Sequence, residues 1–323
     1  MKKIPVLLCL LIPELILVTL QGCRKEVSIA IPDVVTAPLI NLTSESAQTG
    51  GNVISDGGAA VLARGVCWAI TIHPTVTEDH TDNGTGKGNF LSYVDGLNAG
   101  IDYYIRAYAT NSAGTAYGKE IIFRPPLTDI DGNMYNTTII GDQVWMAANL
   151  STTKYNDGTD IPEVDDNTEW TSITTAAFCW YRNDPGSFKQ MYGALYNWFA
   201  VNTGKLCPLG WHVPTETEWT QLTVSVGGEG IASGELKEEG IIHWRYPNAG
   251  ALNDFEFSAL PGGYRNGLKP GSFRSMSYIG WWWSSTQSDV TWARNRTMAY
   301  DATEIAKGWA IKKNGYSVRC VKD

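Results

Sequence analysis

Few residues of this chain have the types and the spacing that catalysis or metal binding requires. Its four histidines are His73, His80, His212 and His243, and no two of them have the spacing of a zinc site. A nucleophilic site would have to use His212 or His243. His212 lies just before a helix-capping sequence, which favours a packing or capping role. We therefore expect no catalytic residue, no metal and no other cofactor.

Two groups of carboxylates resemble functional sites without fitting one. Glu216 and Glu218 follow Thr215 in the pattern Thr-Glu-Thr-Glu, and Glu218 stands where its side chain would cap the backbone N–H of Thr215. Asp129 begins a segment that looks like a calcium loop, but Ile140 occupies the twelfth position, where such a loop needs glutamate. The sequence predicts a helix start at Thr215 and no calcium site at Asp129.

Tryptophan is in surplus. The chain has 13 Trp, twelve of them after residue 126, and Trp281, Trp282 and Trp283 are consecutive. Side chains alternate between the two faces of a strand, so at least one of the three can face away from the core. An exposed Trp can stack on a sugar ring or anchor a protein partner. Burial of all three between strand layers is the open alternative.

Composition and the N-terminus narrow the class of protein. The 323 residues are 43% hydrophobic and 18% charged, with a net charge of −8, which excludes a disordered chain and argues against a nucleic-acid partner. Residues 1–22 have a basic start and an apolar run, as in a secretory signal peptide. Their end resembles a bacterial lipobox, which implies lipid modification of Cys23 and a membrane partner. The alternative is an ordinary signal with an incidental cysteine.

Four cysteines remain after the signal and Cys23, namely Cys67, Cys179, Cys207 and Cys320. Disulfides are expected outside the cytosol, and four cysteines allow three pairings, among which spacing alone does not choose. Cys67 adjoins Trp68 in a predicted strand and is expected to be a buried free thiol.

The elements that position these residues fall into two domains. Residues 23–37 are predicted to be a spacer, and residues 38–126 an all-β sandwich, with strands at 39–42, 51–54, 63–68, 90–94, 103–109 and 119–123. Residues 97–111 resemble the second half of a fibronectin type III module, in which Leu97 and Tyr103 would form the tyrosine corner. Pro125 and Pro126 form a stiff boundary.

Residues 127–323 are predicted to be an α+β domain. Its opening indicates two short strands joined through Gly141 and Asp142. Apolar spacing and caps predict helices over 192–202 and 215–226, and later segments favour strands at 255–265, 281–286 and 316–321.

Several motifs of this domain resemble a known family. They are Trp-Met-Ala-Ala-Asn-Leu at 145–150, Tyr-Gly-Ala-Leu-Tyr-Asn-Trp at 192–198, Cys-Pro-Leu-Gly-Trp-His-Val-Pro-Thr at 207–215, Trp-Trp-Ser-Ser-Thr at 282–286 and Gly-Tyr-Ser-Val-Arg-Cys-Val at 315–321. Together they resemble the Fibrobacter succinogenes major paralogous domain. The resemblance implies a C-type-lectin-like fold in exported bacterial proteins, related to formylglycine-generating enzymes, with no settled activity. Those enzymes hold copper with a cysteine pair, and this chain has no second cysteine near Cys320.

The resemblance also implies a disulfide and a binding region. In the lectin-like fold a long bridge would join Cys207 to Cys320 and leave Cys179 unpaired. Ligand-binding candidates lie in the loop-rich half, where such folds present ligands: Tyr264, Arg265, Asn266, Arg274, Trp282, Trp283, Trp292, Arg294 and Asn295. The Glu-Pro-Asn and Trp-Asn-Asp motifs of calcium-dependent lectins are absent from the sequence.

These observations predict a lipid-anchored outer-membrane lipoprotein of the cell envelope, facing the periplasm or the outside. A β-sandwich spacer would hold out a lectin-like domain that binds a glycan or protein ligand. The alternatives are an envelope scaffold without a dedicated ligand and an enzyme related to formylglycine-generating enzymes.

Overall fold

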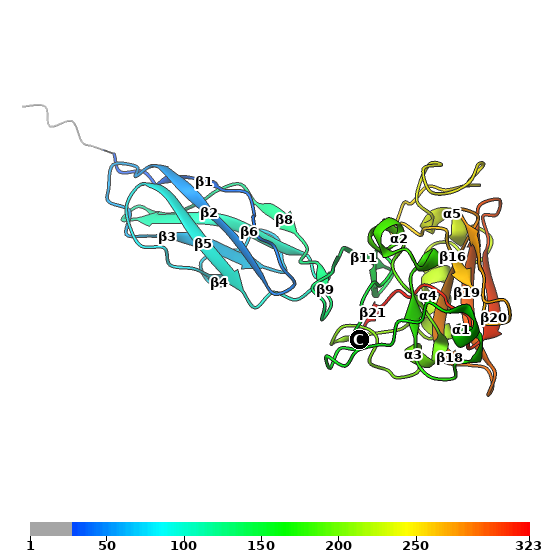
Figure 1. The fold of residues 1–323 in the computed structure, drawn as a ribbon. Helices are drawn as coiled ribbons and strands as arrows, with labels where there is room; N and C mark the ends of the chain where they lie inside the picture. Colours follow the sequence, from blue (N-terminus) through cyan, green and yellow to red (C-terminus); the bar gives the residue numbers. More distant parts are fainter. Residues whose placement is uncertain (1–27) are drawn as a thin grey trace, which may run out of the picture.

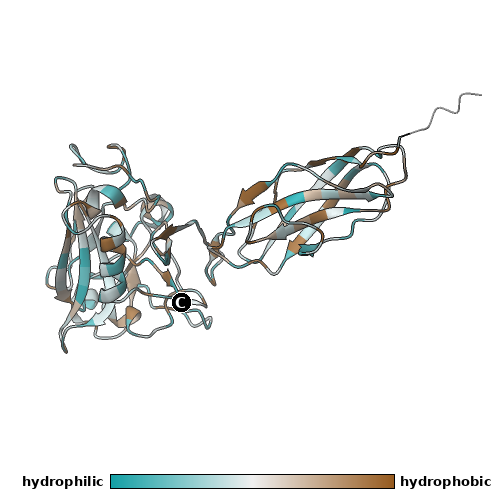
Figure 2. Cartoon of the chain, turned by 180° about the vertical axis from the view of Figure 1, so that it is seen from behind, coloured by the Kyte–Doolittle hydropathy of each residue, from teal (hydrophilic) through white to brown (hydrophobic). Residues whose placement is uncertain are grey.

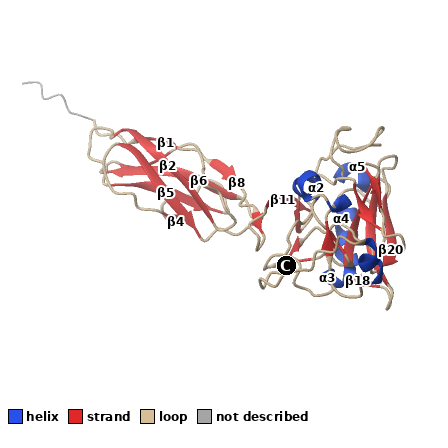
Figure 3. Cartoon of the chain, in the orientation of Figure 1, coloured by secondary structure: helices blue, strands red, loops and turns tan. Residues whose placement is uncertain are grey.

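The computed structural model describes residues 28–323, so the signal peptide and Cys23 lie outside the described residues. The described chain forms two domains that lie end to end (Figure 1). All of its helices belong to the C-terminal domain (Figure 3). Within residues 28–323, no helix is long and apolar enough to cross a bilayer.

The N-terminal domain is a β-sandwich of two antiparallel sheets. One sheet has the order β1-β2-β5, and the other has the order β4-β3-β6-β7, with β8 also paired to β6. The strands are β1 (Asp33–Thr36), β2 (Ser46–Ser55), β3 (Ala63–Ala69), β4 (Asp79–His80), β5 (Gly88–Asp95), β6 (Tyr103–Asn111), β7 (Gly114–Tyr117) and β8 (Ile121–Phe123).

Alternation of apolar and polar residues forms this sandwich, as the brown and teal residues of its strands show (Figure 2). Every second residue of β6, including Tyr103, Ile105 and Ala107, is buried in the core between the sheets. Two predictions were wrong at the start of the domain. Strand β1 pairs with β2, so the sandwich begins inside the predicted spacer. Residues 39–42 form no strand and contribute one isolated bridge at Ile40.

The predicted tyrosine corner is confirmed. The Tyr103 hydroxyl accepts a hydrogen bond from the backbone N–H of Asn98 at 3.1 Å, and both Leu97 and Tyr103 are buried. Cys67 is also buried and unpaired, as expected, and burial raises the pKa of its thiol to about 11. The corner fixes the loop that faces the second domain.

Polar contacts join the two domains around the Pro125–Pro126 boundary. The Arg124 guanidinium binds both carboxylate oxygens of Asp102, at 2.8 and 2.9 Å, and also donates to the backbone carbonyl of Thr137 in the second domain. The Lys322 ammonium donates to the carbonyl of Ala99 at 2.9 Å. The C-terminal strand is thereby attached to the sandwich.

The C-terminal domain contains four small sheets. Their orders are β10-β9, β11-β12-β21-β15, β13-β14 and β17-β16-β18-β19-β20. The strands are β9 (Leu127–Thr128), β10 (Met134–Tyr135), β11 (Thr137–Ile140), β12 (Gln143–Met146), β13 (Phe178–Cys179), β14 (Leu195–Tyr196), β15 (Trp211–His212), β16 (Gly262–Arg265), β17 (Phe273–Met276), β18 (Ile279–Gln287), β19 (Trp292–Ala299), β20 (Ile305–Ile311) and β21 (Val321–Lys322).

The helices of this domain are short. They are α1 (Asn167–Ser172), the 3₁₀ turn η1 (Tyr181–Asn183), α2 (Pro185–Tyr192), α3 (Trp198–Val201), α4 (Glu216–Ser225) and α5 (Ala232–Leu236). Helix α4 is confirmed together with its capping box, since Thr215 and Glu218 cap each other's backbone N–H groups. The helix predicted over 192–202 is wrong in its first half, because Leu195 and Tyr196 pair with β13 and leave one helical turn.

The strand predictions differ in outcome. β11 and β12 form the predicted hairpin around Gly141, and β18 contains the predicted strand at 281–286. The strands predicted at 255–265 and 316–321 shrink to β16 and β21. In the second segment, Tyr316 and Ser317 form isolated bridges with Tyr196 and Trp282 in place of a continuous ladder.

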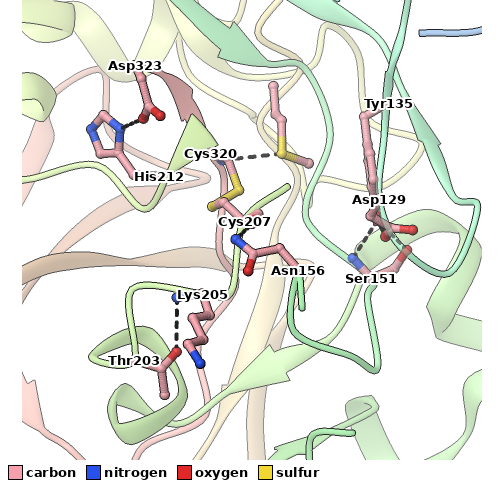
Figure 4. Close-up of a disulfide and its surroundings, with 11 residues drawn as sticks. Asp129, Tyr135, Ser151, Asn156, Thr203, Lys205, Cys207, His212, Cys320 and Asp323 are labelled. Carbon is pink, nitrogen blue, oxygen red and sulfur yellow. Dashed lines mark hydrogen bonds and ion pairs between the residues drawn. A yellow bond between two sulfur atoms is a disulfide. The ribbon is translucent and has the colours of Figure 1, made fainter. Parts of the chain in front are cut away.

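A disulfide joins Cys207 to Cys320 across a sequence separation of 113 residues, which confirms the predicted pairing (Figure 4). Cys207 precedes β15 and Cys320 precedes β21, and these two strands are neighbours in one sheet. Because β21 also pairs with β12, the start, the middle and the end of the domain meet here.

Tryptophan side chains fill the core of the C-terminal domain. Trp145, Trp219 and Trp282 belong to one buried cluster, and Trp198 and Trp283 belong to another. Their indole N–H groups donate to protein acceptors; for example, Trp283 donates to the carbonyl of Tyr196 at 2.8 Å. Most of the Trp surplus is therefore structural.

Candidate functional site

The five-stranded sheet presents one face that helix α4 covers only in part. On that face β19 carries Trp292, Arg294, Arg296 and Met298, because alternate residues point the same way. Met298 and Arg296 are buried, whereas Arg294 is half-buried and Trp292 is exposed. On this face, the side chains of β19 therefore change from buried at Met298 to exposed at Trp292.

Strand β20 extends the uncovered part of this face. Its register places Trp309 opposite Arg294, and Ile311 opposite Trp292. Trp309 is 62% exposed and Trp292 is 38% exposed, the highest values for any Trp in residues 28–323. β20 is the edge strand of the sheet (Figure 1). We call Trp292, Arg294 and Trp309 the Trp patch.

Local contacts hold the Trp patch in shape. In the turn between β18 and β19, the Asp289 carboxylate accepts hydrogen bonds from the backbone N–H groups of Thr291 and Trp292, at 2.7 and 2.8 Å. The Arg294 guanidinium lies 5.0 Å from the centre of the Trp309 ring, a cation–π contact across the two strands. The patch therefore presents two indole rings and one cation on a rigid ladder.

Next to the patch, on the same sheet face, lies an ion pair. Arg296 is fully buried and donates to the Glu216 carboxylate at 2.6 Å, at the first turn of α4. It also donates to the Thr220 hydroxyl at 3.2 Å. This pairing holds the N-terminal end of α4 against the sheet.

Trp282 and Trp283 were wrong as ligand-binding candidates, because both are fully buried. Trp282 faces the α4 side and donates to the Asn149 side chain at 2.8 Å. Trp283 faces the other side and packs against Tyr316, with the rings tilted to each other and their centres 4.5 Å apart. Trp281 is half-buried on the same side. The sheet is covered on both faces at this point.

Arg265 and Asn295 were also wrong candidates, since neither reaches solvent. The Arg265 guanidinium donates to the carbonyls of Val164 and Asp165 and lies over the Trp170 ring at 4.6 Å. It holds a distant loop against the sheet. Asn295 is 4% exposed and accepts a hydrogen bond from the Thr297 hydroxyl.

The remaining candidates do not form one site. Tyr264 is half-buried against Trp281, with ring centres 4.6 Å apart, and Asn266 caps its own turn by accepting from the N–H of Leu268. Arg274 is exposed, at the opposite end of the sheet from the Trp patch. Tyr264 and Arg274 are cross-strand partners, but of the predicted set only Trp292 and Arg294 belong to the Trp patch.

Trp309 was missed in the sequence. Its strand reads Ile-Ala-Lys-Gly-Trp-Ala-Ile, where the small residues Gly308 and Ala310 flank a lone Trp. This pattern is no signal of exposure, because Trp211 also follows a glycine and is buried. The sequence did not show that β20 is an edge strand.

Reactive side chains elsewhere are already engaged. One ring nitrogen of His212 contacts Asp323 at 2.6 Å (Figure 4). The other contacts Glu218 at 2.7 Å, so both ring nitrogens are engaged. Burial alone would lower the pKa of His212, but these hydrogen bonds outweigh burial and raise it. Cys179 is buried, which raises the pKa of its thiol to about 12.

The carboxylate of Asp129 closes its own turn. It accepts hydrogen bonds from the backbone N–H groups of Asp131 and Asn133, at 3.0 and 2.9 Å, and from the Tyr135 hydroxyl (Figure 4). Within residues 28–323, no group of three or more His, Cys, Asp or Glu side chains is placed to hold a metal ion.

Comparisons with known proteins give fold neighbours for the sandwich and a family for the C-terminal domain. Among solved structures, an FNIII domain of a human protein is 20% identical, with 31% of this chain and 82% of that chain covered and a TM-score of 0.24. The sensor domain of the anti-sigma factor RsgI4 from Pseudobacteroides cellulosolvens is 10% identical, with 30% and 97% covered and a TM-score of 0.23. At these scores neither likeness carries a functional argument. No curated protein matches the chain. Residues 139–322 match the profile of the Fibrobacter succinogenes major domain, and the chain belongs to that family.

Proposed function

We propose that this chain is a glycan-binding protein of the bacterial cell envelope and that the Trp patch is its binding surface. The observation that carries the proposal is the exposure of Trp309 and Trp292 on one uncovered sheet face, with Arg294 between them. Indole rings stack on the apolar faces of sugar rings, and an arginine donates hydrogen bonds to sugar hydroxyls.

The shape of the patch favours an extended ligand over a small enclosed one. The two Trp residues stand on neighbouring strands at diagonal positions, which lie about 7–8 Å apart in an antiparallel pair. Such a platform is open along the strand direction, so a linear chain of sugars can pass over it. The covalent and hydrogen-bonded framework beneath it needs no rearrangement for binding.

The proposal includes a C-type-lectin-like fold for residues 127–323 and a lipid anchor at Cys23. Support for the fold comes from the pairing of β12 with β21 and from the disulfide between Cys207 and Cys320, which bring the ends of the domain together. Support for the anchor comes from the lipobox-like sequence before Cys23. The β-sandwich then spaces the binding domain from the membrane.

A polysaccharide and glycan array with the full chain in mild detergent tests this function. We expect binding to at least one neutral glycan, and loss of that binding in Trp309→Ala. Tyr93→Ala is the matched control, because it removes an aromatic ring of similar exposure from the sandwich. Absence of any glycan hit, together with capture of a protein ligand by the same patch, would favour the protein-ligand alternative. Absence of both would favour the scaffold alternative.

A further inference from the structure

A second feature of the C-terminal domain is a hollow of about 550 Å³ at the end of the sheet opposite the Trp patch. Four aromatic rings line it as two pairs. Tyr181 and Phe273 lie 5.2 Å apart between ring centres, and Tyr278 and Tyr300 lie 5.4 Å apart. The volume lies within the range of ordinary ligand sites, and the rings provide walls for a flat ligand.

Arginines surround this hollow without carboxylate partners. Arg182 and Arg274 line it, and Arg245 lies over the Tyr278 ring at 5.0 Å. Among the described residues 28–323, none of the three forms an ion pair with a carboxylate; Arg274 donates only a 3.3 Å hydrogen bond to the Ser272 hydroxyl. Asp301 is the one acidic residue that lines the hollow. Two arginines and one acidic residue line the hollow, a positive balance in a chain with a net charge of −8.

The backbone around the hollow is held in unfavourable conformations. Arg182, Ser275 and Ser277 have φ angles of 56°, 62° and 66°, in the left-handed region that residues with a side chain avoid. Such a conformation is unfavourable and persists only where surrounding contacts impose it. One contact that holds this conformation is the hydrogen bond from the Arg245 backbone N–H to the Ser277 carbonyl, at 2.8 Å. Tertiary contacts therefore hold these loops in backbone conformations that their residues rarely adopt.

From these observations we propose that the hollow is a binding site for an acidic sugar, with a carboxylate on the arginines and the sugar ring against the tyrosines. Arginine presents paired N–H donors that match a carboxylate, and unpaired arginines beside aromatic walls keep that capacity for a ligand. A simple phosphate or sulfate ion would use the arginines alone and would leave the aromatic walls without a contact.

This proposal rests on the proposed glycan-binding function and adds a ligand class to it. The hollow and the Trp patch are separate sites, because Tyr300 directly follows β19 and lies eight residues from Trp292 at the start of that strand, about 26 Å at 3.3 Å per residue. Neutral glycans therefore report on the Trp patch, and the additional binding of carboxylated glycans reports on the hollow.

Titration calorimetry of the full chain with polygalacturonate, alginate and hyaluronan tests the site, with neutral dextran and inorganic polyphosphate as comparison probes. We expect at least one carboxylated polysaccharide to bind. The double variant Arg182→Gln/Arg274→Gln should weaken that binding at least tenfold and leave the thermal unfolding midpoint unchanged, since both side chains are exposed. Lys119→Gln, an exposed cation of the sandwich, is the matched control and should bind as the wild type does.

Three results would overturn the acidic-sugar site: no binding of any of the three carboxylated polysaccharides, equal binding by the double variant, or polyphosphate binding as tight as that of the carboxylated chain. The Trp309→Ala variant separates this outcome from a failure of the Trp patch. It should lose neutral-glycan binding while it retains the arginine-dependent binding of the carboxylated probe.

Discussion

Removal of the disulfide between Cys207 and Cys320 should destabilise the C-terminal domain strongly. The bridge closes a loop with a sequence separation of 113 residues, for which the chain-entropy model gives about 5 kcal/mol at 25 °C. With a urea dependence of about 2–3 kcal/mol per M for a domain of this size, the Cys207→Ala/Cys320→Ala variant should unfold at roughly 2 M less urea. Tryptophan fluorescence reports this transition selectively, because twelve of the 13 Trp lie in that domain.

The single variant Cys179→Ala is the control. It also removes a buried sulfur atom from the C-terminal domain but opens no covalent loop, since this thiol is free. We expect the control to lose only about 1 kcal/mol. The reasoning would be refuted if the bridge variant unfolded within 1 kcal/mol of the wild type, or were no less stable than the control.

Three further predictions concern the chemistry of buried and half-buried groups. Because the pKa of His212 is raised, its contacts with Asp323 and Glu218 stabilise the domain fully below about pH 6.5, and this contribution is lost as the pH rises through the folded-state pKa. The urea midpoint should therefore fall between pH 6 and pH 9 more in the wild type than in His212→Asn, and parallel profiles would contradict this. Arg319 is fully buried and donates to the Ser258 carbonyl at 2.8 Å and to the Asn149 side chain at 3.1 Å. Arg319→Met leaves these acceptors unpaired and should lower the free energy of unfolding in urea by about 3 kcal/mol. An unchanged midpoint would show that the contacts contribute nothing. Because burial raises the pKa of Cys179 to about 12, its thiol should resist iodoacetamide at pH 8 until the chain is denatured, and rapid labelling of the native protein would disprove its burial.

Local signals predicted much of the fold. The capping box at Thr215 and the tyrosine corner at Tyr103 each depend on residues a few positions apart, so the sequence contains all the partners. The pairing of Cys207 with Cys320 needed the family resemblance, because spacing alone allowed three arrangements. The short strand at Leu195 was missed because its stability comes from pairing with Cys179 and not from local propensity.

The candidate site was harder to predict, because exposure depends on distant segments. Alternation along β18 correctly separates Trp282 from its two neighbours, but the covers on the two faces come from α4 and from the segment around Tyr316. Arg265 resembled a surface cation until its partners, about 100 residues earlier in the chain, were known. Conversely, Trp309 is exposed because no other segment of residues 28–323 covers that part of the sheet face.

The central claim is that ligand contact occurs at the Trp patch and not at the buried tryptophans. Fluorine NMR of the protein labelled with 5-fluorotryptophan tests it directly, with resonances assigned from single Trp→Phe variants. Addition of the glycan that binds best on the array should shift the resonances of Trp292 and Trp309 and leave those of Trp282 and Trp283 in place. Binding without any shift at Trp292 and Trp309 would contradict the claim.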